Sequence, residues 1–218
     1  MTENGSRTVD SNQLDIHERL DVIVNKHLMS AFRRPIAGHS RQVFDEITNA
    51  VRERDCPIIL DACCGVGDST RYFAKAFPEC FVVGLDKSIH RLVRQRAEAD
   101  PANMMLRRTD LNDFYRLAVE AGLKPARHYI LYPNPWPKAA HLKRRWHGAP
   151  VFSSIVALGG RLELRSNWEL YLKEFQLALQ LANKSSELNC FTPKESVTPF
   201  EAKYQKDGQQ LWQLIAQL

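Results

Sequence analysis

The alternation of apolar strands and amphipathic helices along this chain predicts an α/β fold, in which a central, mostly parallel sheet is flanked by helices. Two of the predicted strands lead into an acidic residue or a glycine-containing turn, as ligand-binding strands of such sheets do. The 218 residues are 44% hydrophobic, which is enough for one large domain with a buried core.

The predicted elements follow from short apolar runs and from apolar residues at helical spacing. Strands are expected over residues 57–61, 80–85, 104–107, 128–132 and 160–165. Helices are expected over residues 14–29, around 44–51, and over 68–77, 88–97, 111–121 and 168–181. Residues 32–38 are expected to separate the first two helices, residues 183–188 to form a polar loop, and residues 211–218 to form a final strand or a short helix.

Three regions are expected along the chain. Residues 1–14 are rich in polar side chains and predict a disordered tail. Residues 15–55 predict an N-terminal helical extension, and residues 56–218 the main domain. No apolar run is long enough to span a membrane, and the first residues lack the apolar stretch of a signal peptide. We therefore expect a cytoplasmic protein without a membrane partner.

The cysteines predict reduced thiols rather than bridges. There are five of them: Cys56, Cys63, Cys64, Cys80 and Cys190. They contain no C-x-x-C pair, and two of them are adjacent, which suits neither a disulfide framework nor a zinc site. We therefore expect no metal in this protein.

The turn after the first predicted strand, Asp61-Ala-Cys-Cys-Gly-Val-Gly67, is rich in small residues. It resembles the D/E-x-G-x-G-x-G turn of Rossmann-like methyltransferases that use S-adenosylmethionine (SAM), with Gly65 and Gly67 in place and Cys63 at the first glycine. The second predicted strand ends in Asp86, nineteen residues after Gly67, where an acid can accept hydrogen bonds from both ribose hydroxyls. The resemblance implies a Rossmann-like SAM-dependent methyltransferase fold.

The third predicted strand leads to Asp110, which matches the acid that lies against the adenine in this group of enzymes. Asp113 is the competing candidate, and Asp110 also suits the N-cap of the following helix. The resemblance implies a cofactor site made of Asp61, Gly65, Gly67, Asp86, Asp110 and Asn134. A dinucleotide is the alternative ligand, but the third glycine of G-x-G-x-x-G is replaced by Thr70.

A proline segment, Leu131-Tyr-Pro-Asn-Pro-Trp-Pro-Lys138, follows the fourth predicted strand. Its prolines fix φ and extend the residues before them, which holds Asn134, Trp136 and Lys138 in defined directions. Together with His141-Leu-Lys-Arg-Arg145, it resembles the motif F-P-D-P-W-P-K-x-x-H-x-K-R-R of the bacterial tRNA (guanine-N7-)-methyltransferases. Asn134 stands where that family has aspartate.

Positive charge is concentrated at the end of this segment. Five cationic or titratable residues lie within eight positions and are flanked by two tryptophans: Lys138, His141, Lys143, Arg144 and Arg145, with Trp136 and Trp146. Cations bordered by aromatic rings suit a nucleic acid, because it offers both phosphates and bases that stack. The net charge of +5 and the pI near 9.0 do not by themselves distinguish an RNA-binding protein from a soluble enzyme. A solvated charged surface is the alternative for this segment.

Two later segments also resemble this tRNA methyltransferase family. Ser166-Asn-Trp-Glu-Leu-Tyr171 matches T-D-W-x-x-Y, with Asn167 in place of aspartate, and Thr198-Pro-Phe-Glu201 matches the substrate loop T-x-F-E. The resemblance implies substrate contacts by Lys138, Lys143, Arg144, Arg145, Asn167, Thr198, Pro199, Phe200 and Glu201. Two structural alternatives are that Trp168 and Tyr171 belong to the core and that residues 198–201 form a helix capping box.

The implied activity is transfer of a methyl group from SAM to N7 of guanine in tRNA, with Asn134 at the catalytic position. Guanine N7 carries a lone pair and no proton, so the reaction needs alignment rather than a base. The absence of carboxylates at Asn134 and Asn167 would weaken electrostatic stabilisation of the transition state. Two other hypotheses therefore remain: an RNA methyltransferase with another target base, and a SAM-dependent small-molecule enzyme or non-catalytic RNA-binding relative.

Overall fold

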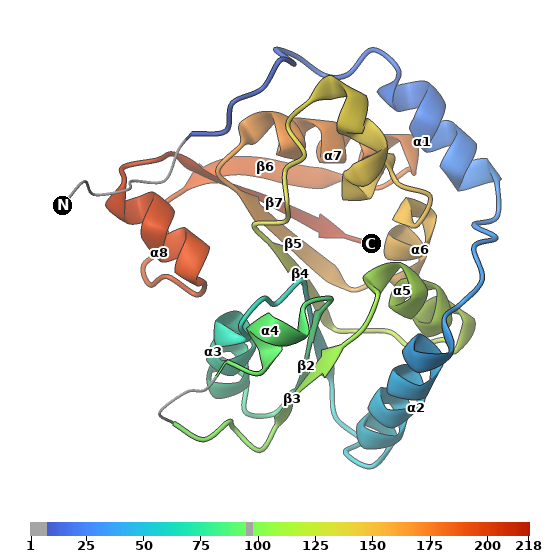
Figure 1. Cartoon of the computed structure of the whole chain (residues 1–218), viewed down its shortest axis with the longest axis vertical. Coiled ribbons are helices and arrows are strands. Elements are labelled where there is room, and N and C mark those ends of the chain that lie inside the picture. Colours follow the sequence, from blue (N-terminus) through green and yellow to red (C-terminus); the bar gives the residue numbers. More distant parts are fainter. Residues whose placement is uncertain (1–7, 95–97) are drawn as a thin grey trace.

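A seven-stranded sheet forms the centre of the computed structural model, which describes residues 8–94 and 98–218 (Figure 1). The strands are β1 (Ile58–Ala62), β2 (Phe81–Asp86), β3 (Met104–Arg108), β4 (Arg127–Leu131), β5 (Arg161–Ser166), β6 (Ser186–Phe191) and β7 (Leu211–Gln217). Their order in the sheet is β3-β2-β1-β4-β5-β7-β6. Strands β1 to β5 are parallel, and β7 runs antiparallel to both β5 and β6.

The direction in which the strands are added changes at β1. Strands β2 and β3 lie on one side of β1, and the chain then returns to place β4 on the other side. The loops that leave the carboxyl ends of β1 and β4 therefore diverge. This is the point at which open α/β sheets form a ligand-binding crevice.

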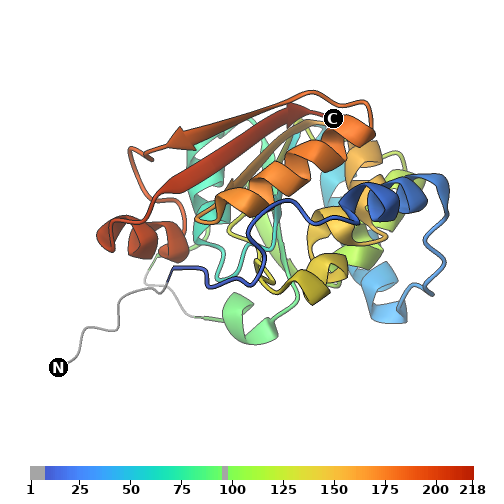
Figure 2. The same ribbon diagram turned by 90° about the horizontal axis from the view of Figure 1, so that it is seen from above.

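Helices cover the two faces of the sheet unequally. They are α1 (Leu20–Met29), α2 (Gly38–Arg52), α3 (Asp68–Ala76), α4 (Ile89–Leu92), α5 (Leu111–Glu120), α6 (Phe152–Leu158), α7 (Glu169–Leu181) and α8 (Pro199–Lys206). Helices α1, α2, α5, α6 and α7 share one apolar core with one face of the sheet, and α3 packs on the other face. Figure 2 shows α1 beside α7, although α6 and most of the sheet separate them in sequence.

The predicted α/β fold class is confirmed, and the first five predicted strands lie within a few residues of β1 to β5. Residues 211–217 form a strand, which decides between the two alternatives for that segment. Helix α1 begins at Leu20 rather than near residue 14. Helix α4 ends at Leu92, and residues 95–97 of the helix predicted there lie outside the described residues.

The loop predicted over residues 183–188 is wrong, because β6 begins at Ser186. This strand lies at the edge of the sheet, pairs only with β7, and exposes alternate side chains. A polar edge strand gives no apolar signal, since neither of its faces is buried as deeply as those of a central strand. Helix α6 was also not predicted.

Residues 1–7 of the predicted disordered tail lie outside the described residues, whereas Ser11 and Asn12, near its end, have specific partners. Ser11 donates a hydrogen bond to the carbonyl of Pro137, and Asn12 accepts one from the amide of Ala139. Within the two described ranges, no helix is both long and apolar enough to cross a bilayer.

Candidate cofactor and substrate site

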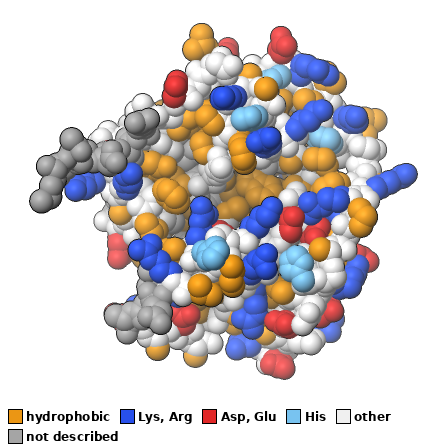
Figure 3. All heavy atoms as spheres, in the orientation of Figure 1, with side chains coloured by type: hydrophobic (Ala, Val, Ile, Leu, Met, Phe, Trp, Pro, Cys, Tyr) orange, Lys and Arg blue, Asp and Glu red, His pale blue; other side chains and the backbone are white. Residues whose placement is uncertain are grey.

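A cavity of about 480 Å³ lies over the carboxyl ends of β1, β2 and β4. This volume is in the range of about 300–1,000 Å³ that is typical of ligand sites. Its walls come from the turn after β1, the ends of β2, β3 and β4, Trp146, and the start of α8. On the face of the molecule shown in Figure 3, hydrophobic side chains gather at the centre, with Lys and Arg side chains around them.

The turn after β1 has the backbone that the small residues predict. Cys63, Gly65 and Gly67 have φ values of 62°, 61° and 81°, a left-handed conformation that glycine adopts without steric cost. A Cβ atom at Gly67 would lie 2.7 Å from the end of the Leu106 side chain, which could shift, so the positive φ is the main reason for glycine at that position. Cys63 adopts the same conformation with a side chain, and its side chain forms part of the cavity wall.

Asp86 closes β2 and faces this turn. Its Oδ2 accepts a hydrogen bond of 3.0 Å from the amide of Gly65, and its Oδ1 accepts one of 2.7 Å from the amide of Ser88. The side chain is 5% exposed and lines the cavity. Each carboxylate oxygen can accept a second hydrogen bond, so Asp86 is fixed in place and still able to bind a pair of hydroxyl groups.

Asp61 is buried at the end of β1, behind the cavity wall. Its Oδ2 accepts hydrogen bonds from Ser69 (2.7 Å) and Thr70 (2.6 Å), while Oδ1 has no partner among the described residues. Burial raises the pKa of Asp61 to about 6. A buried acceptor without a partner is costly. Asp61 does not itself line the cavity, so its predicted contact with the cofactor stays a prediction.

Asp110 lines the cavity, whereas Asp113 does not. Asp110 is the N-cap of α5, because its Oδ1 accepts a hydrogen bond of 2.9 Å from the amide of Asn112. The carboxylate of Asp113 is instead bound by Arg34 (2.6 Å) and by the amide of Ala37 (3.2 Å). The structure therefore brings Asp110 rather than Asp113 to the cavity, in addition to its role as a helix cap.

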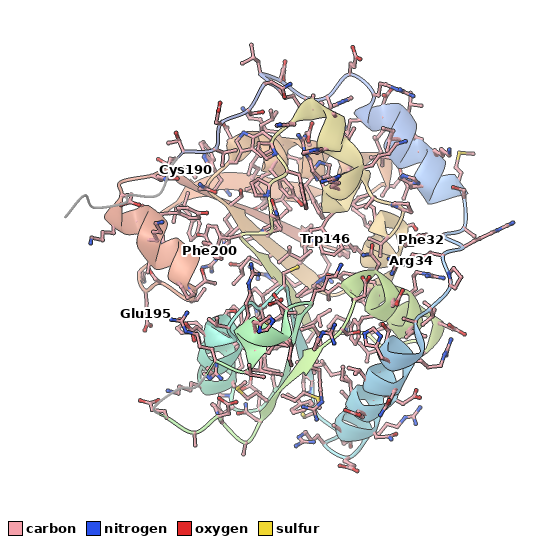
Figure 4. The ribbon with its side chains drawn as sticks, in the orientation of Figure 1. Phe32, Arg34, Trp146, Cys190, Glu195 and Phe200 are labelled. Carbon is pink, nitrogen blue, oxygen red and sulfur yellow. The ribbon has the colours of Figure 1, made fainter. Side chains whose placement is uncertain are left out.

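Arg34 joins the N-terminal extension to this part of the site, and sequence patterns did not point to it. Its Nη2 lies 3.1 Å from Asp110 and 2.6 Å from Asp113. Phe32 packs beneath Arg34 and Arg116, and Figure 4 shows Phe32 and Arg34 together in the segment before α2. Residues 32–37, which were predicted only to separate two helices, therefore also bind the start of α5.

Asn134 lies at the cavity, at the centre of the proline segment. Its Oδ1 accepts a hydrogen bond of 3.3 Å from the amide of Trp136, and its Nδ2 has no partner among the described residues. Tyr132 and Trp136 have positive φ values of 50° and 47°, so the segment turns sharply on either side of Asn134. Trp136 and Lys138 lie outside the cavity wall.

The start of α8 forms the opposite wall. Thr198 caps the helix by accepting a hydrogen bond of 3.0 Å from the amide of Glu201, and Thr198, Pro199 and Phe200 line the cavity. Phe200 is 50% exposed. Figure 4 shows Phe200 and Trp146 on opposite sides of this region.

Glu201 does not fit the predicted role as a substrate contact. It is buried, and its carboxylate accepts hydrogen bonds from Tyr132 (2.7 Å), Arg165 (2.9 Å) and the amide of Val197 (2.8 Å). In a capping box this carboxylate would accept a hydrogen bond from the amide of Thr198, but here it accepts one from the amide of Val197. Glu201 therefore joins α8 to the ends of β4 and β5.

The cationic residues after the proline segment divide into two groups. Lys138, Lys143 and Arg144 are exposed, and the guanidinium of Arg144 lies 4.8 Å from the ring centre of Trp136. Arg145 is fully buried and pairs with Glu174, so the predicted contact between Arg145 and substrate does not fit its position. Sequence alone could not separate adjacent arginines that point in opposite directions.

Asn167 also lies outside the cavity wall. Its Nδ2 donates a hydrogen bond of 2.8 Å to Gln209. Tyr171 is 1% exposed and accepts a hydrogen bond from the amide of Trp146, which confirms the core alternative for Tyr171. Trp168 is partly buried and lies under Arg145.

Three basic residues of the cavity rim were not predicted: Lys87, Arg91 and Arg94. They follow the strand acid Asp86 and are exposed on and around α4. The only signal for them in the sequence was their place after that acid.

The cysteines of the cavity wall are neutral thiols. Burial raises the pKa of Cys63 to about 12 and that of Cys64 well above its usual value. Neither is therefore available as a thiolate nucleophile at neutral pH. Across the described part of the chain, no group of three or more His, Cys, Asp or Glu side chains is arranged to hold a metal ion.

The model of the family Methyltransf_4, described as "Putative methyltransferase", matches residues 55–214. The chain belongs to this family. The matched range contains all residues that line the cavity, so the whole site of this methyltransferase lies in the part that defines the family.

Several proteins named tRNA (guanine-N(7)-)-methyltransferase resemble this methyltransferase. The one from Rubrobacter xylanophilus is 26% identical over 163 residues, which are 72% of this chain and 71% of that protein. The one from Thiobacillus denitrificans is 26% identical over 177 residues, or 77% of this chain and 78% of that protein. The one from Pectobacterium atrosepticum is 26% identical over 194 residues, or 83% and 80%.

Solved structures of methyltransferases have the same fold. The 16S rRNA methyltransferase KamB has a TM-score of 0.58 at 15% identity, covering 80% of this chain and 93% of its own. A variant of the 16S rRNA (adenine(1408)-N(1))-methyltransferase from Catenulisporales acidiphilia, solved with cosubstrate SAM, has a TM-score of 0.54 at 18% identity, covering 80% and 90%. At these identities the likeness concerns the fold alone.

Proposed function

We propose that this methyltransferase uses SAM to methylate guanine at N7 in tRNA. One observation supports the proposal most strongly: the cofactor-type turn and the proline segment line the same cavity, with Gly65 and Asp86 on one side and Asn134 on the other. The relatives named tRNA (guanine-N(7)-)-methyltransferase supply the target base and the class of RNA.

The residues of the cavity suit a reaction without proton removal. When bound, SAM would supply a methyl group on a sulfonium. The lone pair of N7 would form a bond to that methyl carbon as the carbon–sulfur bond breaks, and the neutral thioether would leave with the bonding electrons. Asp86 and Asp110 already accept hydrogen bonds from backbone amides, and Tyr132 donates its proton to Glu201. Guanine N7 carries no proton to remove, so the reaction requires no general base, and alignment of the reacting atoms must supply most of the rate.

Asn134 would help to position the base. The amide of Trp136 orients its side chain through Oδ1, and its Nδ2 is able to donate. A donor suits O6 of guanine, which lies beside N7.

The walls and rim of the cavity are suited to a nucleotide that has left its stack. Phe200 and Trp146 offer aromatic surfaces to a base, and stacking on such a ring contributes about 1–3 kcal/mol. The rim carries Lys87, Arg91 and Arg94 on one side, and the exposed Lys143 and Arg144 follow the proline segment. Cations around an aromatic cavity are appropriate for the phosphates on either side of a target base.

The test is transfer of a labelled methyl group from SAM to bulk tRNA by the purified protein, with free guanosine as a parallel substrate. We expect label in tRNA and none in guanosine, because the rim contacts need flanking phosphates. Label in guanosine alone would favour a small-molecule enzyme, and label in neither would contradict the proposal.

A further inference from the structure

A short segment before α1 is bound to residues 132–139, which include most of the proline segment and which we call the proline turn. Ser11 Oγ donates a hydrogen bond of 2.6 Å to the carbonyl of Pro137, and Asn12 Oδ1 accepts one of 3.0 Å from the amide of Ala139. We call residues 11–17 the strap. Figures 1 and 2 show it, in dark blue, passing the loop between β4 and α6.

The strap is fixed at its other end by Glu174, a fully buried residue of α7. Glu174 Oε1 accepts hydrogen bonds from Gln13 Nε2 (2.6 Å) and from the amide of His17 (2.9 Å). Its Oε2 accepts hydrogen bonds from Arg145 Nη1 (2.5 Å) and from His147 Nε2 (2.9 Å). One carboxylate therefore joins the strap to the segment that follows the proline turn.

Arg145 continues this network into the turn itself. Its Nε and Nη2 donate to the carbonyl of Trp136 at 3.2 and 3.1 Å, and Nη2 lies 3.4 Å from the carbonyl of Lys138. The carbonyls of residues 136, 137 and 138 are thus all bound by Arg145 or by the strap. Trp136 has a φ of 47°, and a strained residue of this kind persists only where its surroundings hold it.

We propose that the strap is a positioning element of the substrate site, which holds the turn that carries Asn134 and Lys138. The inference rests on the proposed function, because it assigns to that turn the placement of the target base. It follows that Ser11 and Asn12, the strap residues whose side chains bind the turn, act on the transfer step to RNA and leave cofactor binding unaffected. None of them lines the cavity.

The test compares a strap variant with a matched neighbour. In the double variant Ser11→Ala/Asn12→Ala, we expect kcat for tRNA methylation to fall about tenfold or more, since small misplacements of reacting groups have effects of that size. The dissociation constant of SAM should stay within about twofold of wild type. Leu14→Ser is the control, because Leu14 is 96% exposed and its side chain has no polar atom that could bind the turn or Glu174.

A rescue variant and an exchange measurement separate positioning from general stability. Ser11→Thr and Asn12→Asp keep the hydroxyl and the acceptor oxygen, and should retain activity. Hydrogen exchange at the amide of Ala139 should become faster in Asn12→Ala but not in Leu14→Ser, because this amide donates to Asn12. If wild type methylates no tRNA, the proposed function is refuted. Hydrogen exchange at Ala139 still tests whether the strap holds the turn, because this measurement does not depend on activity.

Three results would overturn the strap proposal. The first is unchanged exchange at Ala139 in Asn12→Ala. The second is an unchanged kcat in the double variant of an active enzyme. The third is a parallel loss of SAM affinity and thermal stability, because the strap would then support the fold as a whole rather than the turn.

Discussion

Arg145 and Glu174 form an ion pair inside the protein, with 2.5 Å between Nη1 and Oε2 and neither side chain exposed. Burial alone would raise the pKa of Glu174, but the hydrogen bond from His147 and the charges of His147 and Arg145 lower it to about 2. Burial lowers the pKa of His147 itself, although Glu174 acts to raise it. Arg145 carries a permanent positive charge, so Glu174 keeps a charged partner whether or not His147 is protonated.

Replacement of Glu174 by Gln should destabilise the fold by about 3–5 kcal/mol, the usual effect of leaving a buried charge without its partner. Glu169→Gln on the same helix is the control, because Glu169 pairs with Lys173 at the surface, where both side chains are more than a third exposed. A surface pair of this kind contributes at most about 1 kcal/mol. Urea unfolding measures both variants, and equal effects would contradict the account.

The same pair predicts how stability responds to acid. The pKa of Glu174 is lower in the folded protein than in the unfolded chain, so its contribution is present above about pH 4.5 and is lost as pH falls towards 2. The loss should reach roughly 3 kcal/mol over that interval. Glu174→Gln should lack this component. The difference in unfolding free energy between wild type and the variant, measured by urea unfolding, should therefore be smaller at pH 3 than at pH 6. A difference that stays constant from pH 6 to pH 3 would refute the assigned role of Glu174.

Neutralising Lys143 and Arg144 to Gln should weaken tRNA binding and reduce its salt dependence. The slope of log K against log salt should fall by about 0.7–0.9 for each phosphate that these side chains no longer neutralise. Arg145 is excluded from this variant because it is buried. Arg52→Gln/Lys124→Gln is the control, since these residues precede β1 and β4 and lie at the amino end of the sheet. An unchanged slope would favour the solvated-surface alternative.

Asp86→Ala should weaken SAM binding by about 1.5–3 kcal/mol, the value of a hydrogen bond to a charged partner. The variant removes an acceptor that lines the cavity and is bound to the amide of Gly65. Asp100→Ala is the control, because Asp100 is an exposed acid that pairs with Arg71 away from the cavity wall. Calorimetric titration compares them, and equal SAM affinity in wild type and Asp86→Ala would show that the cofactor site is wrongly assigned.

Asn134→Asp should increase methyl transfer about tenfold, which corresponds to about 1.4 kcal/mol of transition-state stabilisation. An added carboxylate at the cavity would stabilise the positive charge that develops on guanine, and aspartate can still accept the amide of Trp136 as Asn134 does. Asn189→Asp, an equal change on the exposed side of β6, should have no effect. If Asn134→Asp abolishes transfer by a folded protein, the asparagine belongs to a different function.

The sequence was most informative where local chemistry dictates local structure. The central strands are continuous apolar runs because both faces of the sheet are covered, and the turn from Asp61 to Gly67 needs residues that tolerate positive φ. The cavity residues Gly65, Asp86, Asp110 and Asn134 follow directly from these elements.

Tertiary partners account for what the sequence could not predict. Arg145 and Glu201 stand in motifs that resemble substrate-binding segments, but each is buried by contacts with α7, β4 or β5. Their partner residues are distant in sequence, and no local pattern reveals them. The same holds for residues 11–13, whose polar composition predicts disorder but whose side chains fit the proline turn and Glu174.

The most direct test of the proposed function is to identify the nucleoside that carries the methyl group. Bulk tRNA is incubated with the protein and labelled SAM, digested to nucleosides and separated against standards. The account predicts label in 7-methylguanosine, because Asn134 lies at the cavity with a side-chain donor that suits O6 of guanine, beside N7. Label in a nucleoside methylated on an exocyclic amine, or no label in tRNA at all, would contradict it.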